Sequence, residues 1–277
     1  MNRIDQKFRA LAERGRKALV PYVTAGHPHP DASVDILHAA VEAGADLLEL
    51  GMPFSDVMAD GPVIQNACAK ALHHGTDLDS VLDMVRQFRS RDADTPVILM
   101  GYTNPIERRG AGRFAAEAAA AGVDALLVVD CPADEAEQLK TELARHGLHQ
   151  IFLVAPTTTE QRLQRMARLA GGFVYYVSIK GVTGASSLDV STLAPAVKRI
   201  RAAADLPVAI GFGIREPDQA AAVARAADAV VIGSALVERL DRCSSAAEAV
   251  AETRAYLGSV RAAMDAVGAD RQAVASA

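Results

Sequence analysis

Short apolar runs and amphipathic segments alternate along the chain. An opening segment carries Ile4, Phe8 and Leu11 on one helical face. After it, each apolar run is followed by roughly 12 to 20 residues that have charged positions on one side, the pattern of a strand followed by a helix. We predict eight strands, at Ala18–Thr24, Leu47–Gly51, Val97–Tyr102, Ala125–Asp130, Ile151–Ala155, Phe173–Ser178, Val208–Gly213 and Ala229–Gly233. The clearest helical patterns are Ser33–Ala43, Glu135–His146, Glu160–Leu169, Leu193–Ala204 and Gln219–Ala227.

Continuous apolar strands separated by helices indicate a parallel sheet that is covered on both faces. Eight such units within about 250 residues favour a (β/α)8 barrel over an open doubly wound sheet. The segment Gly211–Glu216 lacks the final glycine of a dinucleotide-binding GxGxxG motif and comes too late in the chain. We therefore predict an α/β fold, a single (β/α)8 TIM barrel over residues 1–268 with an extra N-terminal helix. Residues 269–277 are small and polar, and we expect a disordered tail there.

Composition narrows the possible partners. Half of the 277 residues are hydrophobic and the net charge is −5, spread over helices of mixed sign without a basic block. Nucleic acid and anionic membranes are therefore excluded as expected partners. The cysteines Cys68, Cys131 and Cys243 are far apart, which indicates free thiols in a reducing compartment. The charged N-terminus lacks the apolar core of a signal peptide and no run is long enough to cross a membrane, so we expect a cytoplasmic protein.

One apolar strand carries a carboxylate where an aliphatic residue is expected. Glu49 lies in this strand, and the chain then breaks at Pro53 into a loop that holds Asp56 and Asp60. Burying an ionised carboxylate is costly unless it is paired or used. Two carboxyl groups on adjoining backbone can move protons on a substrate held between them. The alternative is structural: an ion pair for Glu49, and an Asp60 that caps the helix beginning at Pro62.

The working residues of such a barrel lie at the C-terminal ends of its strands and in the loops that follow. Met100, Leu127 and Leu153 are inward-facing positions at that end, enough for an apolar pocket of aromatic size. Asp130 precedes a Cys–Pro pair and can instead cap that turn. The residues that this rule brings to one mouth are Tyr22, Glu49, Tyr102, Asp130, Tyr175, Gly211 and Gly213.

Glycine-rich turns in the last third of the chain indicate a phosphate site. Glycines let the backbone approach an anion, and the N–H groups at a helix start donate to it. In these barrels the site is frequently built from the loops after strands seven and eight together with a short helix. Here those loops hold Gly213 and Gly233–Ser234, while Lys180–Ser186 after the sixth strand is a candidate lid. Three glycine turns at consecutive strands favour phosphate binding over ordinary turn chemistry.

Paired histidines raise the question of a metal site. They occur as His27 and His29 in a proline-interrupted loop, and as His73 and His74 at the end of a helical pattern. No cysteine or carboxylate cluster stands at ligand spacing from either pair. We therefore expect no metal in this chain.

Taken together, these motifs resemble the α subunits of tryptophan synthase between about Ala18 and Leu240. The resemblance implies a barrel lyase that splits indole-3-glycerol phosphate into indole and glyceraldehyde 3-phosphate. It also implies an α2β2 complex with a β subunit that holds pyridoxal phosphate, and no cofactor in this chain. The motifs that carry it are Leu48–Asp56, Ala59–Pro62, Asn104–Ile106, Val154–Thr158, Gly181–Gly184 and Gly211–Ile214.

The resemblance also implies roles for individual residues. Glu49 would be the general acid/base that protonates the indole at C3, and Asp60 would bind the indole N–H and stabilise the positive charge on the ring. Val57 and Met58 replace a common Pro-Leu pair, and Cys68 replaces a usual polar residue, all near the surface expected to meet the β subunit. The positions implied to line the site are Tyr22, Met100, Leu127, Tyr175, Thr183 and Phe212, and those of the phosphate cradle are Gly184, Gly213, Gly233 and Ser234.

Two alternatives to the α-subunit interpretation remain open from the sequence. The first is a free-standing indole-glycerol-phosphate lyase that has the same residues and no partner. The second is a barrel that only activates the β subunit, which is disfavoured because Glu49 and Asp60 are both present.

Overall fold

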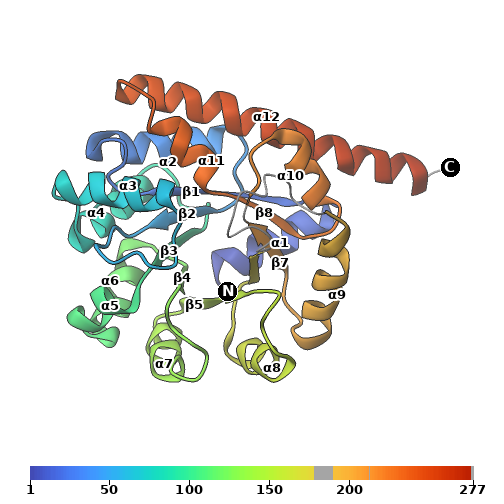
Figure 1. Cartoon of the computed structure of the whole chain (residues 1–277), viewed down its shortest axis with the longest axis horizontal. Coiled ribbons are helices and arrows are strands. Elements are labelled where there is room, and N and C mark those ends of the chain that lie inside the picture. The colour runs from blue at the N-terminus through green and yellow to red at the C-terminus, as the bar shows by residue number, and fades with distance from the viewer. Residues whose placement is uncertain (178–189, 212, 276–277) are drawn as a thin grey trace.

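Eight parallel strands close into a barrel in the computed structural model, which describes residues 1–177, 190–211 and 213–275 (Figure 1). Each strand pairs with the next, and β1 pairs with β8 to complete the ring. The predicted (β/α)8 barrel is confirmed. The strands are β1 (Ala18–Thr24), β2 (Leu48–Gly51), β3 (Val97–Gly101), β4 (Ala125–Val128), β5 (His149–Val154), β6 (Val174–Val177), β7 (Val208–Gly211) and β8 (Ala229–Ile232).

Helices surround this ring and account for the amphipathic segments. Two loops carry a pair of helices each, between β2 and β3 and between β3 and β4. The helices are α1 (Arg3–Glu13), α2 (Ser33–Glu42), α3 (Pro62–His73), α4 (Leu78–Arg89), α5 (Thr103–Arg109), α6 (Ala111–Ala121), α7 (Glu137–Arg145), α8 (Glu160–Leu169), α9 (Leu193–Ala203), α10 (Pro217–Ala224), α11 (Ser234–Leu240) and α12 (Ala246–Ala275), with 3-10 turns at Pro30–Ala32 and Val190–Thr192. Within the described ranges, no helix combines the length and the apolar character that a membrane crossing requires.

The C-terminal helix α12 is the longest helix in Figure 1, where it runs in red along one side of the barrel. It packs against α2, α10 and α11. It also includes residues 269–275, where the sequence predicts a disordered tail. The domain boundary at residue 268 stays a prediction.

Alternation along the strands separates two apolar layers. In β8, Ala229 and Val231 belong to the core inside the barrel, while Val230 and Ile232 pack in the layer beneath the helices. Leu48 and Leu50 of β2 also belong to the outer layer. By the same alternation Glu49, which lies between Leu48 and Leu50, points into the barrel.

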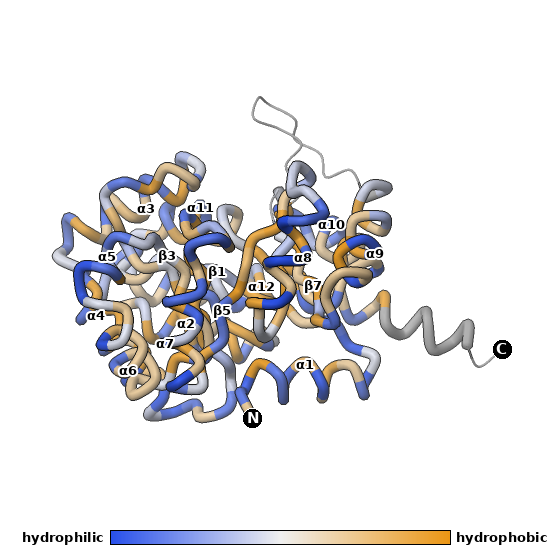
Figure 2. The backbone as a smooth tube through the Cα atoms, turned by 90° about the horizontal axis from the view of Figure 1, so that it is seen from below, coloured by the Kyte–Doolittle hydropathy of each residue, from blue (hydrophilic) through white to orange (hydrophobic). Residues whose placement is uncertain are grey.

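The predicted N-terminal helix closes one end of the barrel. Ile4, Phe8 and Leu11 of α1 are buried in the inner core, and the Phe8 ring lies 5.7 Å from that of Phe173. Figure 2 shows α1 at the lower end of the molecule, with α3 and α11 at the upper end. The mouth formed by the carboxyl ends of the strands therefore lies at the end that α1 leaves open.

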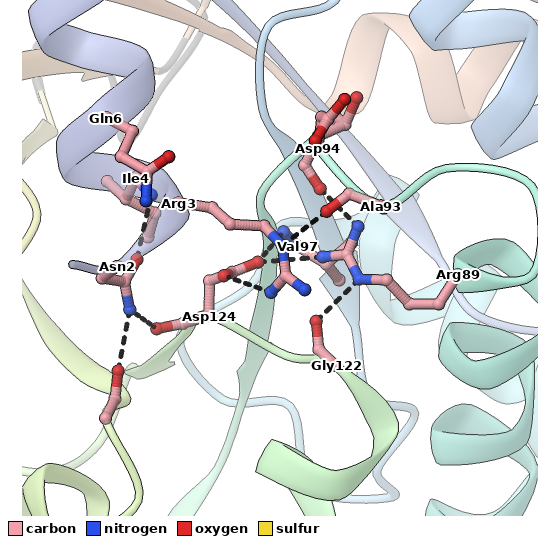
Figure 3. A network of polar contacts seen from close by, with 12 residues as sticks. Asn2, Arg3, Ile4, Gln6, Arg89, Ala93, Asp94, Val97, Gly122 and Asp124 are labelled. Carbon is pink, nitrogen blue, oxygen red and sulfur yellow. Dashed lines mark hydrogen bonds and ion pairs between the residues drawn. The ribbon is translucent and has the colours of Figure 1, made fainter.

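A buried carboxylate, Asp124, fixes α1 to the barrel (Figure 3). Its side chain is 3% exposed and pairs with Arg3 of α1 and with Arg89 of α4, each at 2.9 Å. It also accepts a hydrogen bond from the Val97 N–H, and its own carbonyl accepts one from the Asn2 amide. Because both oxygens are paired, the cost of burying this charge is offset by specific contacts.

Candidate active site

Glu49 is buried inside the barrel mouth, where the described part of the chain offers it no charge partner. Its side chain is 2% exposed, and no described residue provides a cation or hydrogen-bond donor to its carboxyl group. Burial, and then the negative charge of Asp60, raises the pKa of Glu49 to about 8. The structural ion pair considered from the sequence is therefore absent among the described residues. This pKa shift favours the protonated form of the Glu49 carboxyl group near neutral pH.

Asp60 lies in the loop between β2 and α3 and has a different environment. The Tyr102 hydroxyl donates a 2.7 Å hydrogen bond to its carboxylate and accepts one from the Ala59 N–H. Burial raises the pKa of Asp60, and the Tyr102 hydrogen bond lowers it. Asp60 does not cap α3, because the N-cap is Gly61 and no side chain bonds there. The two acids therefore differ: Glu49 has no partner within residues 1–177, 190–211 and 213–275, whereas Asp60 accepts a hydrogen bond from the Tyr102 hydroxyl.

The predicted lining residues of the described chain lie on strands of the barrel, in or against its inner core. Met100 of β3 and Leu127 of β4 are register partners that belong to the inner core, together with half-buried Tyr175 of β6. Tyr22 of β1 is a register partner of Glu49 and is buried. Burial raises the pKa of Tyr175, and the charge of Glu49 adds to that shift.

Tyr22 occupies the space that the missing side chain of Gly51 leaves open. A Cβ atom at Gly51 would lie 2.1 Å from the Tyr22 hydroxyl oxygen. The hydroxyl group itself is 3.1 Å from the Thr24 hydroxyl. The glycine at the end of β2 therefore lets an aromatic ring cross over the strand next to Glu49.

The glycine turns after β7 and β8 lie at the same end of the barrel. Gly213 has φ +72°, a left-handed conformation that favours glycine, and its outer face is open. Gly233 is the N-cap of α11, a helix that begins at exposed Ser234 and packs against β1. The prediction of a short helix after β8 is confirmed. Thr183, Gly184 and Phe212, and the candidate lid Lys180–Ser186, lie outside the described residues.

The sequence predicts Asp130 at the mouth of the barrel. In the structure its carboxylate contacts the first residue of α5. Its carboxylate accepts hydrogen bonds from the N–H and hydroxyl groups of Thr103, the first residue of α5. It therefore holds the start of α5, rather than capping the Cys–Pro turn that follows it. Tyr102 was placed at the mouth by the sequence, but its bond to Asp60 depends on the loop conformation and was missed.

The histidines and cysteines form no metal centre in the described ranges, where no group of three or more histidine, cysteine or acidic side chains could hold an ion. Buried His27 contacts Asp241 at 2.9 Å, and the rings of His29 and His74 stack on each other. Cys68 lies beneath the loop between β2 and α3 that holds Asp56 and Asp60, which we call the acid loop. Burial raises the pKa of its thiol to about 11. This thiol is therefore un-ionised at neutral pH.

Known proteins match the chain over nearly its whole length. A family model described as tryptophan synthase alpha chain matches residues 8–265. A relative of that name from Thioalkalivibrio sulfidiphilus is 58% identical, covering 87% of this chain and 90% of its own. One from Alkalilimnicola ehrlichii is 54% identical, covering 96% and 97%.

Solved structures agree with these sequence matches. The crystal structure of tryptophan synthase subunit alpha from Legionella pneumophila superposes with a TM-score of 0.89 at 43% identity, covering 96% of this chain and 99% of that one. A chain of tryptophan synthase from Mycobacterium tuberculosis gives 0.84 at 35% identity, covering 95% and 100%. The chain therefore belongs to the tryptophan synthase alpha chain family.

Proposed function

We propose that Glu49 and Asp60 carry the lyase reaction of this family, the cleavage of indole-3-glycerol phosphate into indole and glyceraldehyde 3-phosphate. The observation that supports these roles is the contrast between their environments. Glu49 is buried with no partner among the described residues and has a pKa of about 8, whereas the Asp60 carboxylate accepts a hydrogen bond from Tyr102. Two acids whose environments differ in this way suit two different tasks.

Glu49 is the group that moves protons. Protonated at neutral pH, it donates its proton to C3 of the indole ring, which makes the ring an electron sink. The bond between C3 and the glycerol side chain then breaks, and its electron pair restores the aromatic ring. The Glu49 carboxylate takes the proton of the adjacent side-chain hydroxyl, which becomes the aldehyde. The enzyme therefore ends the cycle with Glu49 protonated again.

Asp60 provides the charge. Protonation at C3 places positive charge on the indole nitrogen, and a carboxylate that accepts the N–H hydrogen bond stabilises that charge in the transition state. The Tyr102 hydroxyl keeps one oxygen of Asp60 in place and favours its ionised form. The other oxygen is left to face the substrate.

The remaining predicted residues bind the two ends of the substrate. Tyr22, Met100, Leu127 and Tyr175 provide apolar surface for the indole ring, and we assign Thr183 and Phe212 to the same pocket from the resemblance. Gly213, Gly233 and Ser234, with Gly184, form the phosphate cradle, since backbone N–H groups beside glycines and at a helix start bind anions. No cofactor is needed in this chain for these steps.

The partner is a tryptophan synthase β subunit in an α2β2 complex, and pyridoxal phosphate belongs to that partner. Membership of the family supports this assignment. Met58, in the loop that carries Asp60, is 91% exposed, an unusual position for a large apolar side chain. We place the protein in the cytoplasm, where its thiols stay reduced.

An indole-release assay on the purified chain, alone and with a β subunit, tests the proposal. We expect slow cleavage alone and faster cleavage in the complex. Full activity alone, with no complex at micromolar β subunit, would instead indicate the free-standing lyase. No cleavage in either case, with tryptophan formation by β still stimulated, would indicate an activating barrel.

A further inference from the structure

Arg215 lies in the loop between β7 and α10, two positions after Gly213. Three of its groups, the N–H, the carbonyl and the guanidinium, each contact a different helix. Its N–H donates a 2.8 Å hydrogen bond to the side-chain oxygen of Gln219 in α10. Its carbonyl accepts a 2.8 Å bond from the Tyr256 hydroxyl of α12. Its guanidinium pairs with Glu238 of α11. Arg215 is thus fixed by contacts with three different helices.

Tyr256 is the buried member of this set. Its side chain is 4% exposed although its hydroxyl makes a bond to the backbone. Burial raises its pKa to about 12, so the hydroxyl remains a donor at any working pH. Its ring also meets α11, because the Arg239 guanidinium lies 4.3 Å from the ring centroid, a cation–π geometry. Tyr256 of α12 therefore contacts both the β7–α10 loop, through the Arg215 carbonyl, and α11, through Arg239.

Helix α11 is itself fixed to α12 beside this ring. Arg239 forms a 2.9 Å ion pair with Glu252, which lies one helical turn before Tyr256. On α11, Glu238 lies one turn after Ser234 and accepts the Arg215 contact across the gap between the two loops. An exposed ion pair alone contributes little to stability. Here the Arg215–Glu238 pair joins the β7–α10 loop to α11, and buried Tyr256 contacts both of these elements.

We propose that Tyr256 is a positioning residue that sets the spacing between the β7–α10 loop and the start of α11, and thereby the affinity for the phosphate group. The proposal rests on the phosphate cradle of the proposed function. An anion site built from backbone N–H groups needs those groups at fixed separation, since each donor must point at the same oxygen cluster. Tyr256 touches neither the phosphate nor the indole and acts only through Arg215 and Arg239.

Tyr256→Phe tests the proposal, because it removes the hydroxyl and keeps the ring under Arg239. Loss of one hydrogen bond from the loop should raise KM for indole-3-glycerol phosphate about 3- to 10-fold. The dissociation constant of glycerol 3-phosphate, measured by calorimetry, should rise by a similar factor. We expect kcat to stay within about 2-fold, since Glu49 and Asp60 are untouched.

Thr253→Val is the matched control. Thr253 is fully buried on the same helix, and its hydroxyl donates a 2.8 Å bond to the Ala249 carbonyl, a bond within α12 that involves neither the β7–α10 loop nor α11. It should lower thermal stability without changing KM or glycerol 3-phosphate binding. Arg239→Leu, which removes the contact of α11 with the ring, should weaken phosphate binding like Tyr256→Phe and carries the test if Tyr256→Phe does not fold.

Dephosphorylated indole-3-glycerol separates the possible outcomes. Wild type should discriminate against it, and Tyr256→Phe should leave its kcat/KM unchanged. An equal loss on both substrates, or the same loss of glycerol 3-phosphate affinity in Thr253→Val, would overturn the positioning role and leave Tyr256 as a packing residue. A wild-type chain that does not cleave or does not discriminate would instead contradict the proposed function itself.

Discussion

At the scale of single residues, the Glu49 carboxyl group allows a direct test of the proposed chemistry. Glu49→Gln keeps the shape of the side chain but cannot transfer a proton, so we expect kcat for indole release to fall by about 100-fold or more. The far-ultraviolet circular dichroism and the affinity for glycerol 3-phosphate should stay close to wild type. Retention of more than about a tenth of the activity would show that another group moves the proton.

The same substitution should change how stability depends on pH. Glu49 has a pKa of about 8 in the folded chain, against 4.5 for an ordinary glutamate. The folded state therefore holds this proton more tightly, and its stabilising contribution is complete below pH 4.5 and lost as pH rises through about 8. Glu49→Gln has no such loss. In urea unfolding it should be more stable than wild type at pH 9, by an amount of the order of a few kcal/mol, and the advantage should shrink towards pH 5.

Substitution of Asp60 tests whether a negative charge is needed to stabilise the positive charge on the indole ring. Asp60→Asn can still accept the indole N–H but cannot balance a growing positive charge, so we expect kcat to fall about 100-fold or more. Tyr102→Phe leaves the carboxylate in place and removes only its hydrogen bond, so its loss should be smaller, about 10-fold. Steady-state kinetics on both variants separate these effects. A raised KM with normal kcat for Asp60→Asn would restrict Asp60 to substrate binding.

The residues that sequence reasoning identified differ from those it missed in the range of their interactions. Glu49 stands out locally, because a carboxylate interrupts an apolar strand. The bonds of Tyr102 to Asp60 and of Tyr256 to Arg215 join positions 42 and 41 residues apart. No local pattern records such a pairing, since it depends on how a loop or a terminal helix packs.

At the scale of elements, the strands were the most predictable feature. Eight apolar runs gave eight strands, because a parallel strand covered on both faces is apolar along most of its length. Helix α8 begins and ends where its pattern predicts, with Thr159 accepting a hydrogen bond at its start. The strands predicted at Ala125–Asp130 and Val208–Gly213 extend too far toward the C-terminus, because Asp130 and Gly213 already belong to loops. The paired helices after β2 and β3 and the length of α12 were not foreseen.

The glycine turns call for a test that separates the ligand from the fold. Gly213→Val forces a branched side chain into φ +72° and should destabilise the loop as well as raise KM. At Gly233 a Cβ atom would make only an ordinary contact, 3.9 Å from the Tyr22 Cβ. We therefore expect Gly233→Val to raise KM for the phosphorylated substrate strongly, about 10-fold or more, with a smaller change in melting temperature. Equal losses on dephosphorylated substrate would mean that both glycines serve the fold alone.

At the scale of the whole molecule, the two ends of the barrel have different tasks. α1 plugs one end and is fixed there by the Asp124 network. The other end carries Glu49, the acid loop and the turns after β7 and β8. Because the plug and the site lie at opposite ends, a partner can cover the mouth without disturbing the part of the fold that closes the inner core.

A partner docked on this open mouth is expected to change both the fate of the indole and the turnover of the site. Indole is small and apolar, so a site that releases it into solvent loses it, whereas a second enzyme docked on the mouth receives it directly. A partner that orders the acid loop would also hold Asp60 in place, so binding should raise turnover. We expect the isolated chain to be a weakly active monomer that a cognate β subunit stimulates at least about 10-fold, a coupling of roughly 1.4 kcal/mol.

Two neighbouring side chains of the acid loop can locate that contact. Met58 is 91% exposed, whereas Val57 is buried against Ile64 and Cys68 beneath the loop. Met58→Ser should therefore reduce the stimulation and leave the activity of the isolated chain unchanged. Val57→Pro, which introduces the proline that the resemblance implies at this position, should alter the stimulation more than the basal rate. Sedimentation with β subunit and steady-state assays decide the matter: stimulation unaffected by Met58→Ser would place the β contact elsewhere on the mouth.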